Sequence, residues 1–417
     1  MTSLSRNFSD SLSTRYVTLN KGHATFFSMK HSLLVLLLTA IACSGSDSND
    51  SPQQTKATEV ASDWEIYRGN PSLHGVAPGS LQGQPALAWT FQTEGAIVSS
   101  PVVSKGLTFF GSSDGSLYAV ELETGKKRWS FATDDIIDAP PLVHDGRVFF
   151  GSADFFFHAL DAETGKSIWK YETEDKILGG ANWARGADGK TRILVGSYDT
   201  HLYCFSPEDG ELLWKYETEN YVNGTPAILG DHVIFGGCDA VLHIISITTG
   251  EKVAEVDLGT DCHVAGSVAL ADGKAYFGHY GNAFICIDLE SGQLLWDHQD
   301  PQYAFFSSPA IAPNRIVFGG RNKHLTCVDK ATGELLWTFK TKRKVDASPV
   351  ICGDRVICGS GDGRLYILDL DDGTEVWNYE IGQAIFSSPA VAAGMILVGS
   401  NDKRLYAFRS NPDKEGR

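Results

Sequence analysis

Short stretches of alternating hydrophobic and polar residues, separated by turns of glycine and aspartate, follow one another from about Leu87 to Phe408. Such stretches are typical of strands that bury one face, because successive side chains of a strand point to opposite sides of the sheet. No segment after Trp64 shows the repeat of an amphipathic helix, so an all-β domain is predicted. In the unit from Ala96 to Phe131, the expected strands are Ser99–Val103, Leu107–Gly111, Leu117–Glu121 and Arg128–Phe131.

The four-strand unit recurs with a period of about 40 residues, and a tryptophan marks its last strand. Trp129 follows Trp89 by 40 residues. The interval from Trp214 to Trp296 spans 82 residues, because Val253-Ala254 stands where a tryptophan is expected. A period of this length built from short strands is typical of a β-propeller. The marker tryptophans are Trp89, Trp129, Trp169, Trp214, Trp296, Trp337 and Trp377.

The two ends of the repeat region complement each other. The last unit, Phe386 to Phe408, contains only three expected strands, whereas Leu87–Phe91 has the form of an isolated outer strand. Pairing these two ends would complete the last unit and remove an open sheet edge. The sequence therefore predicts a single eight-bladed β-propeller of four-stranded blades over residues 63–410, with the last blade closed by the strand around Trp89.

The residues before the repeats have the features of a targeting segment. Residues 29–42 combine a short basic start, an apolar run and small residues before Cys43, as in a secretory signal. With a cysteine directly after the small residue, the segment resembles a bacterial lipoprotein signal in which Cys43 is acylated. A plain secretory signal with an incidental cysteine is the alternative. Residues 1–28 are expected to be a non-native upstream extension, residues 43–62 a flexible tether and residues 411–417 a polar tail.

Charge and cysteine usage narrow the classes of partner. The formal net charge of −16 argues against DNA or RNA, because binding phosphates requires a basic face. Cys204, Cys286 and Cys327 occupy a repeat position that holds alanine in other units, so buried free thiols are expected there. Cys352 and Cys358 flank a turn without facing each other in a hairpin register, which does not favour a disulfide.

Two turn sequences suggest a family. Asp161–Lys166 before Trp169, and Asp329–Glu334 before Trp337, resemble the tryptophan-docking repeat of the pyrroloquinoline quinone (PQQ)-type propellers, and Asp63–Asn70 resembles the segment that opens many of them. The resemblance implies that each marker tryptophan docks against the neighbouring blade. The family includes quinoprotein dehydrogenases and non-enzymatic propellers, among them a lipoprotein of the outer-membrane β-barrel assembly machinery. In related lipoproteins, a residue such as Ser44 after the cysteine implies the outer membrane, facing the periplasm.

The dehydrogenase branch implies residues that can be sought one by one. Its members typically use adjacent cysteines, acidic and amide calcium ligands, an aspartate base and a tryptophan floor. The chain has no adjacent cysteines and no Cys-x-x-Cys-His, and its nearest candidates are Asn182-Trp183, Asp138 and Asp346. Aligning the units places at the mouth of the central channel Val98, Asp138, Leu178, Asn223, Ala265, Phe306, Asp346 and Phe386. A polyanionic quinone would need cations or a metal there, so neither PQQ nor calcium is expected, and no catalytic or metal-binding residues are assigned.

The loops that link each outer strand to the next unit share one face of the predicted ring, and their charges differ. Most are acidic, but one is strongly basic and carries Lys340, Lys342, Arg343 and Lys344. A charged rim around aromatic anchors is typical of protein interfaces. The alternative is that these turns are merely solvated. The candidate partner-binding residues are Lys340, Lys342, Arg343, Lys344, Phe306, Phe386, Asp138 and Asp346.

Three hypotheses for function remain at this point. The leading one is a monomeric, lipid-anchored, non-enzymatic scaffold that binds other proteins of the bacterial cell envelope, as the family resemblance implies. The resemblance extends that role to outer-membrane β-barrel assembly. The second is a PQQ-dependent dehydrogenase, and the third is a surface module that binds polysaccharide through exposed aromatic residues. Fold alone does not decide among them.

Overall fold

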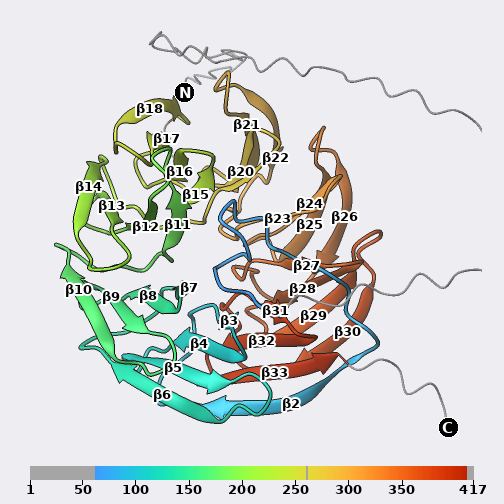
Figure 1. Ribbon diagram of the computed structural model, residues 1–417. Coiled ribbons are helices and arrows are strands. Elements are labelled where there is room, and N and C mark those ends of the chain that lie inside the picture. The colour runs from blue at the N-terminus through green and yellow to red at the C-terminus, as the bar shows by residue number, and fades with distance from the viewer. Residues whose placement is uncertain (1–61, 260–261, 411–417) are drawn as a thin grey trace, which may run out of the picture. The chain divides into compact units, whose positions relative to one another are not determined.

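A computed structural model describes residues 62–259 and 262–410, and every regular element within them is a β-strand. Eight antiparallel four-stranded sheets stand as blades around a common centre (Figure 1). The predicted all-β, eight-bladed propeller is therefore confirmed. The expected extension, signal segment, acylated Cys43, nearly all of the tether and the polar tail lie outside the described residues.

The first four blades follow one another along the chain. Blade 1 comprises β3 (Val102–Ser104), β4 (Leu107–Gly111), β5 (Ser116–Glu121) and β6 (Lys127–Ala132). Blade 2 comprises β7 (Leu142–His144), β8 (Arg147–Gly151), β9 (Phe156–Asp161) and β10 (Ser167–Glu172). Blade 3 comprises β11 (Asn182–Arg185), β12 (Thr191–Gly196), β13 (His201–Phe205) and β14 (Leu212–Glu217). Blade 4 comprises β15 (Ala227–Leu229), β16 (His232–Gly236), β17 (Val241–Ser246) and β18 (Lys252–Asp257).

The remaining blades include two that recruit strands from the N-terminal side. Blade 5 comprises β19 (Ala269–Ala271), β20 (Lys274–Gly278), β21 (Ala283–Asp288) and β22 (Leu294–Gln299). Blade 6 comprises β23 (Ala310–Ile311), β24 (Arg315–Gly319), β25 (His324–Asp329) and β26 (Leu335–Lys340). Blade 7 comprises β27 (Val350–Cys352), β28 (Arg355–Gly359), β29 (Arg364–Asp369), β30 (Glu375–Glu380) and the added parallel strand β1 (Val76–Ala77). Blade 8 comprises β31 (Ala390–Ala392), β32 (Met395–Ser400), β33 (Arg404–Ser410) and β2 (Pro85–Gln92).

Burial explains the order of strands within a blade. The two middle strands, such as β4 and β5, have only buried and half-buried residues, whereas the outer strand β6 has only exposed and half-buried ones. The innermost strand of blade 1 begins at Val102, so the expected start at Ser99 is wrong. Pro101 has no N–H to donate to a sheet, and the serines before it bond to neighbouring blades instead.

Strand β2 closes the ring from the other end of the chain. It pairs antiparallel with β33, and the register places Pro85 opposite Ser410, Trp89 opposite Ala407 and Gln92 opposite Arg404. Figure 1 shows the blue β2 along the outside of the red blade 8. The predicted closure of the last blade by the strand around Trp89 is thus confirmed.

The marker tryptophans form a repeated contact between blades. Trp129 donates a hydrogen bond from Nε1 to the carbonyl oxygen of Ala162 in the next blade, at 3.1 Å. Its ring lies against Gly165, where an added Cβ would come within 2.6 Å of the indole and where φ is +70°. Only glycine suits that position. The same bond is made to the next blade by Trp89, Trp169, Trp214, Trp296 and Trp337. Trp377 packs instead on Phe408, with ring centroids 5.4 Å apart.

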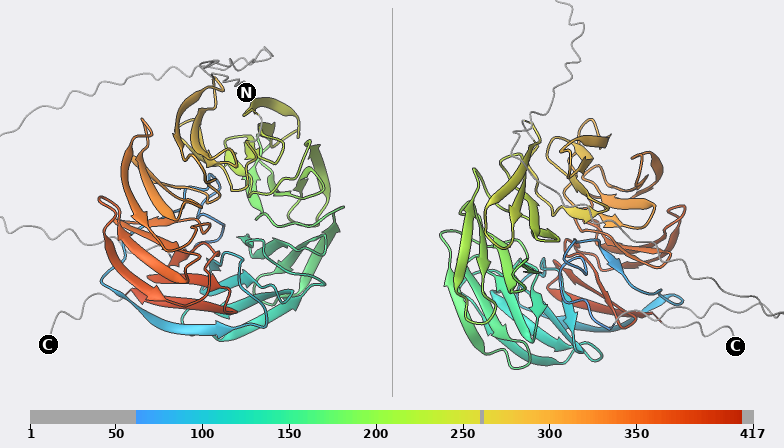
Figure 2. Two further views of the ribbon diagram at one scale, coloured as in Figure 1. Left: turned by 180° about the vertical axis from the view of Figure 1, so that it is seen from behind. Right: turned by 45° about the horizontal axis from the view of Figure 1, so that its top comes forward.

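The segment between Ser62 and β2 crosses one end of the central channel; we call it the plug. Its backbone makes hydrogen bonds with the innermost strands of six blades, namely blades 1, 2, 4, 5, 6 and 7. In blade 3, the side chain of Asn182 donates a hydrogen bond to the carbonyl oxygen of Pro71. The inner-strand residues bonded to its backbone are Val103, Val143, Ile228, Leu270, Ile311 and Ile351. Front and back views both place this blue segment in the middle of the ring (Figure 2). Sequence analysis identified its resemblance but not this position.

Arg68 fastens the plug to blades 6 and 7. The residue is 1% exposed, and its Nη2 donates to the carbonyl oxygens of Pro309 and Pro349 at 2.7 and 2.6 Å. Burial lowers the pKa of Arg68 to about 10, so the guanidinium remains charged at neutral pH. A buried charge is costly unless hydrogen bonds compensate for lost hydration, and these two carbonyls provide part of that compensation.

The buried cysteines of the blades behave as small apolar residues. Cys204, Cys286 and Cys327 are free and fully buried, as expected. Cys352 and Cys358 are also free and buried, and they lie opposite Arg355 and Tyr366 rather than opposite each other. Burial raises the pKa of the Cys352 thiol to about 12, which disfavours the reactive thiolate.

The blade-to-blade contact of Trp337 should make a large contribution to stability. Trp337→Ala is expected to lower the free energy of unfolding by about 3–5 kcal/mol, because a buried aromatic side chain and its hydrogen bond are lost together. Urea denaturation followed by circular dichroism measures the change. Leu336→Ala, at a neighbouring side chain that is 47% exposed, is the matched control. A loss below about 1 kcal/mol for Trp337→Ala would contradict the docking role.

Candidate functional site

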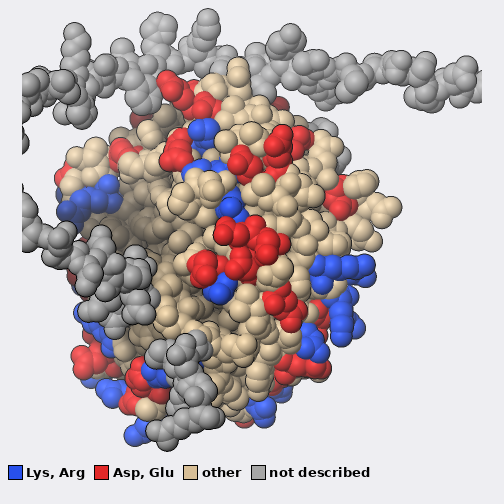
Figure 3. Space-filling view, turned by 90° about the vertical axis from the view of Figure 1, so that its right-hand side faces the viewer, with Lys and Arg blue, Asp and Glu red and all other residues tan. Residues whose placement is uncertain are grey.

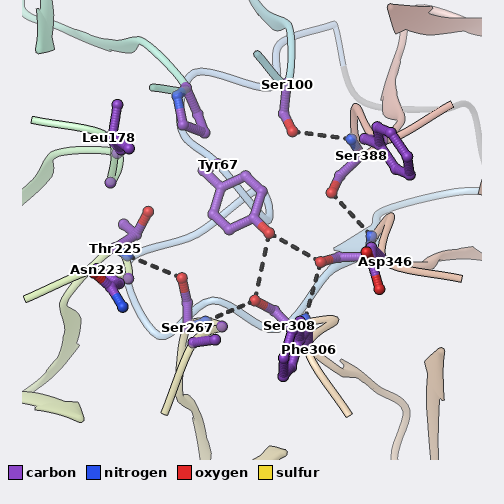
Figure 4. A pocket seen from close by; sticks show the side chains of 18 residues that line it. Tyr67, Ser100, Leu178, Asn223, Thr225, Ser267, Phe306, Ser308, Asp346 and Ser388 are labelled. Carbon is purple, nitrogen blue, oxygen red and sulfur yellow. Dashed lines mark hydrogen bonds between the residues drawn. The ribbon is translucent and has the colours of Figure 1, made fainter. Parts of the chain in front are cut away.

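A cavity of about 160 Å³ lies at the centre of the ring, bounded at its inner end by Tyr67 of the plug (Figure 4). Six of the eight residues expected at the channel mouth line it, whereas Val98 and Asp138 do not. The lining residues among those expected are Leu178, Asn223, Ala265, Phe306, Asp346 and Phe386. We call this cavity the cup.

A layer of hydroxyl groups surrounds the deeper part of the cup. The backbone N–H of Ser388 donates to Ser100 Oγ, that of Ser348 donates to Ser388 Oγ, and the pattern continues around the ring to Thr225, at 2.9–3.0 Å. The plug joins this layer, because Tyr67 Oη lies 2.9 Å from Ser348 Oγ. Pro140 and Gly180 interrupt the layer in two blades. The repeated Ser-Ser-Pro sequence, as at Ser99–Pro101 and Ser307–Pro309, is the signal in the sequence for this layer.

Charged and aromatic side chains from blades 6 to 8 meet at the mouth of the cup. Asp346 pairs with Lys344 at 2.6 Å and with Arg321 at 3.2 Å. The Arg321 guanidinium lies over the Phe306 ring, 3.7 Å from its centroid, and Lys344 Nζ lies over Phe386 at 4.9 Å. The structure therefore brings together four of the candidate partner-binding residues and adds Arg321, which sequence analysis missed.

Tyrosines extend this mouth towards blades 3 to 5. Tyr280 contacts Phe306 with ring centroids 4.4 Å apart, and Tyr198 stacks on Tyr221 at 4.8 Å. Tyr221 and Tyr280 are 44% and 49% exposed. Tyr198, Tyr280 and Arg321 share one repeat position, the second residue after the second strand of a blade, so variation at that position was the missed signal. The mouth collar consists of Tyr198, Tyr221, Tyr280, Phe306, Arg321, Lys344, Asp346 and Phe386.

The basic loop beside the collar has a fixed backbone and free side chains. Thr341 is buried and donates from Oγ1 to the carbonyl oxygen of Lys323 at 2.9 Å, and the Lys342 N–H donates to Asp362 Oδ2 at 2.9 Å. Lys340, Lys342 and Arg343 are exposed, and no ion pair neutralises them within residues 62–259 and 262–410. Their charges are thus available to a partner.

Asp138 lies apart from the other candidate residues. It belongs to blade 2 and accepts a hydrogen bond from Ser113 Oγ at 3.1 Å. Burial raises the pKa of Asp138. No contact in the described part of the chain joins it to the collar, so the structure does not unite the two carboxylates that sequence analysis placed in one ring.

Aspartates in the turn between the second and third strands of a blade hold the preceding loop. Asp114 Oδ2, for example, accepts the Glu94 N–H at 3.0 Å and the Tyr118 hydroxyl at 2.9 Å. In blade 4, Asp239 pairs with His243 Nε2 at 2.8 Å, and both side chains are buried. Burial acts to raise the pKa of Asp239, but the hydrogen bond and the charge interaction with His243 outweigh it, so its pKa lies below the usual value.

The lowered pKa of Asp239 predicts a loss of stability in acid. A carboxylate with a folded-state pKa below its unfolded value of about 3.9 stabilises the fold fully above about pH 5, and this contribution is lost as the pH falls through the folded-state pKa. Asp239→Asn is expected to lower the melting temperature at pH 7 and to differ progressively less from the native chain as the pH falls towards 3. The exposed Asp134→Asn is the control. A difference that is constant with pH would contradict the assignment.

Among residues 62–259 and 262–410, no three His, Cys, Asp or Glu side chains are placed to hold a metal ion. None of the described residues forms a helix that is long and apolar enough to cross a membrane.

Family models match two parts of the chain. Residues 184–415 match the family described as the β-propeller of the β-alanine-activating enzyme, and residues 82–184 match that described as outer membrane protein assembly factor BamB. The first match covers more than half of the 417 residues. No curated protein matches the sequence.

Solved structures share the fold at low sequence identity. BamB from Moraxella catarrhalis has a TM-score of 0.66 at 18% identity, over 80% of this chain and 99% of that protein. A quinohemoprotein alcohol dehydrogenase from Pseudomonas putida HK5 has a TM-score of 0.72 at 12% identity, over 85% of this chain and 81% of the enzyme. A europium-containing methanol dehydrogenase has a TM-score of 0.69 at 13% identity, over 84% of this chain and 98% of the enzyme.

Proposed function

The chain belongs to the β-propeller family described for the β-alanine-activating enzyme, a PQQ-like propeller family, and from this premise we propose that it is a non-enzymatic scaffold that binds partner proteins. The observation that carries the proposal is the mouth collar with the adjoining basic loop. Together they place exposed aromatic rings beside cations on a rigid backbone. Aromatic residues and arginine are the side chains that most often anchor protein interfaces.

The charge distribution supports a partner with an acidic surface. The chain carries a formal net charge of −16, yet Lys340, Lys342 and Arg343 form an exposed basic cluster without ion-pair partners in the described residues. On the side of the molecule shown in Figure 3, acidic side chains gather near the middle with a few basic ones beside them, and broad uncharged areas surround them. Complementary charge of this kind steers association and selects partners.

The proposed setting is the bacterial cell envelope. We place the propeller at the outer membrane, facing the periplasm, as a monomer held by a lipid on Cys43. The signal-like residues 29–42 and the similarity to BamB support this placement. The proposed partners are other envelope proteins, including one that takes part in outer-membrane β-barrel assembly; the description of the matching family names outer membrane protein assembly. Neither nucleic acid nor a metal cofactor has a part in this function.

Reversing the charge of the basic loop tests the proposal. Crosslinking of the tagged chain in its native envelope, followed by mass spectrometry, is expected to recover a reproducible partner. The triple variant Lys342→Glu, Arg343→Glu, Lys344→Glu is expected to reduce that recovery at least tenfold with little change in melting temperature, because the loop backbone is held by Thr341 and by Asp362.

The matched control changes the same number of charges at a different place. The triple variant Lys126→Glu, Lys127→Glu, Arg128→Glu alters three exposed cations at the start of outer strand β6, away from the loop face. It is expected to capture the partner as well as the native chain does. Equal capture by both triple variants would refute the assignment of the basic loop.

A quinone-dependent dehydrogenase is the second candidate, favoured by the similarity of the whole ring to two such enzymes. No three His, Cys, Asp or Glu side chains of the described residues are grouped to hold a metal ion, and no two cysteines are adjacent in the sequence. Adding PQQ with calcium is therefore expected to leave the melting temperature unchanged and to support no reduction of an electron-accepting dye by alcohols. A rise of several degrees together with dye reduction would replace the scaffold proposal with the enzyme.

A further inference from the structure

The hydroxyl layer of the cup contains hydrogen-bond donors without acceptors. Ser100, Ser267 and Ser388 each accept a backbone N–H at Oγ, at 2.9–3.0 Å. A serine hydroxyl that accepts one hydrogen bond still has its own hydrogen to donate. Within the described parts of the chain, no acceptor takes these three hydrogens, although the serines that precede Ser100 and Ser388 do donate theirs to carbonyl groups. The wall of the cup therefore offers three hydroxyl hydrogens to a ligand that carries hydrogen-bond acceptors.

A buried positive charge lies next to this layer. Arg68 Nη2 donates hydrogen bonds to the carbonyl oxygens of Pro309 and Pro349. These two prolines directly follow Ser308 and Ser348 of the layer. Among the described residues, Arg68 has no carboxylate partner, and its Nε and Nη1 have no hydrogen-bond partner. A cation that is not neutralised in a low-dielectric surrounding favours a negative charge nearby. The charge and the free hydroxyl hydrogens thus favour the same kind of ligand, an anionic oxygen.

Burial shows how a ligand would enter. Phe306, Asp346 and Phe386 at the mouth are half-buried, whereas the serines of the layer are only 2–7% exposed and Arg68 is 1% exposed. The plug occupies the opposite end of the channel, so the cup opens at the mouth collar. The carboxylate of Asp346 does not oppose an anion there, because it is shared between Arg321 and Lys344, which leaves a net positive charge at the mouth.

We propose that the cup binds the terminal carboxylate of an extended polypeptide, with the carboxylate oxygens at the free hydroxyl hydrogens of Ser100 and Ser388 and beside Tyr67 Oη, which also contacts Ser308 and Ser348. This inference rests on the proposed function, since it names the part of a protein partner that the collar receives. A cavity of about 160 Å³ holds about one residue, so the residue before it passes between Phe306 and Phe386. In Figure 4 the serine and tyrosine oxygens lie around the inner cavity, and Phe306 lies at its edge.

Titration calorimetry of the purified chain tests the proposal with three probes. The probes are N-acetyl-Phe-Gly with a free carboxylate, the same peptide with a terminal amide, and sodium acetate. The free acid is expected to bind at least tenfold more tightly than the amide and than acetate, because it alone supplies both the carboxylate and an aromatic residue for the collar. Equal affinity for acid and amide, or binding of neither, overturns the proposal. Acetate binding as tightly as the peptide acid assigns the cup to small free acids and overturns the polypeptide.

Variants of the hydroxyl layer locate the binding. Ser100→Ala with Ser388→Ala is expected to remove the tenfold preference for the acid, whereas Ser130→Ala with Ser167→Ala, on exposed outer strands, is expected to retain it. Tyr67→Phe removes a single hydroxyl without disturbing an inner strand. It is expected to weaken binding of the peptide acid but not of the peptide amide. This variant tests the position of binding even if the serine double variant fails to fold. A preference that survives Tyr67→Phe and the serine variant would refute the assigned position.

The outcomes separate this inference from the proposed function. If the charge-reversed basic loop abolishes capture of the partner while acid and amide bind equally, the collar is a docking surface and the cup does not recognise a chain end. If the acid is preferred but charge reversal leaves capture unchanged, the cup recognises carboxylates and the basic loop is not the docking site.

Discussion

Closure of the ring by β2 and β33 is the constraint on which the rest of the structure depends. The pairing joins residues 312 positions apart, as in the hydrogen bond between Gln92 and Arg404. Because loop entropy grows only logarithmically with length, closing so long a loop costs about 5 kcal/mol. The strand pairing, together with the contact of Trp89 with blade 1, offsets that cost. Closure also removes the free edges that an open array of blades would expose.

A closed ring leaves a channel at its centre, and two sequence features determine the lining of this channel and the end at which it is open. The Ser-Ser-Pro repeat puts hydroxyl groups rather than apolar side chains on the inner wall, where they bond blade to blade. The plug then fills one end and brings Arg68 into the interior without a counter-ion in the described residues. The result is a polar cup with one entrance, which differs from the apolar packing expected of a purely structural channel.

The proposed scaffold role follows from the way the entrance is built. Turn aspartates such as Asp362 hold the loop backbones, so the backbone that presents the cations and rings loses little further entropy when a partner binds. Arg321 and Lys344 are attracted both to Asp346 and to the faces of two phenylalanines, which keeps them at the mouth. A preorganised surface of this kind suits the recognition of proteins.

The sequence by itself determined the number of blades, the strands within them, the tryptophan positions and the closing strand, because each is a local pattern repeated about every 40 residues. It also placed six of the channel-mouth residues, since a repeat fixes equivalent positions. Only the tertiary structure decided the course of the plug, whose residues belong to no repeat and bond to strands throughout the ring. The meeting of Arg321 with Phe306 and Asp346 was likewise decided there, because contacts between blades depend on side-chain geometry across distant segments that no repeat period encodes.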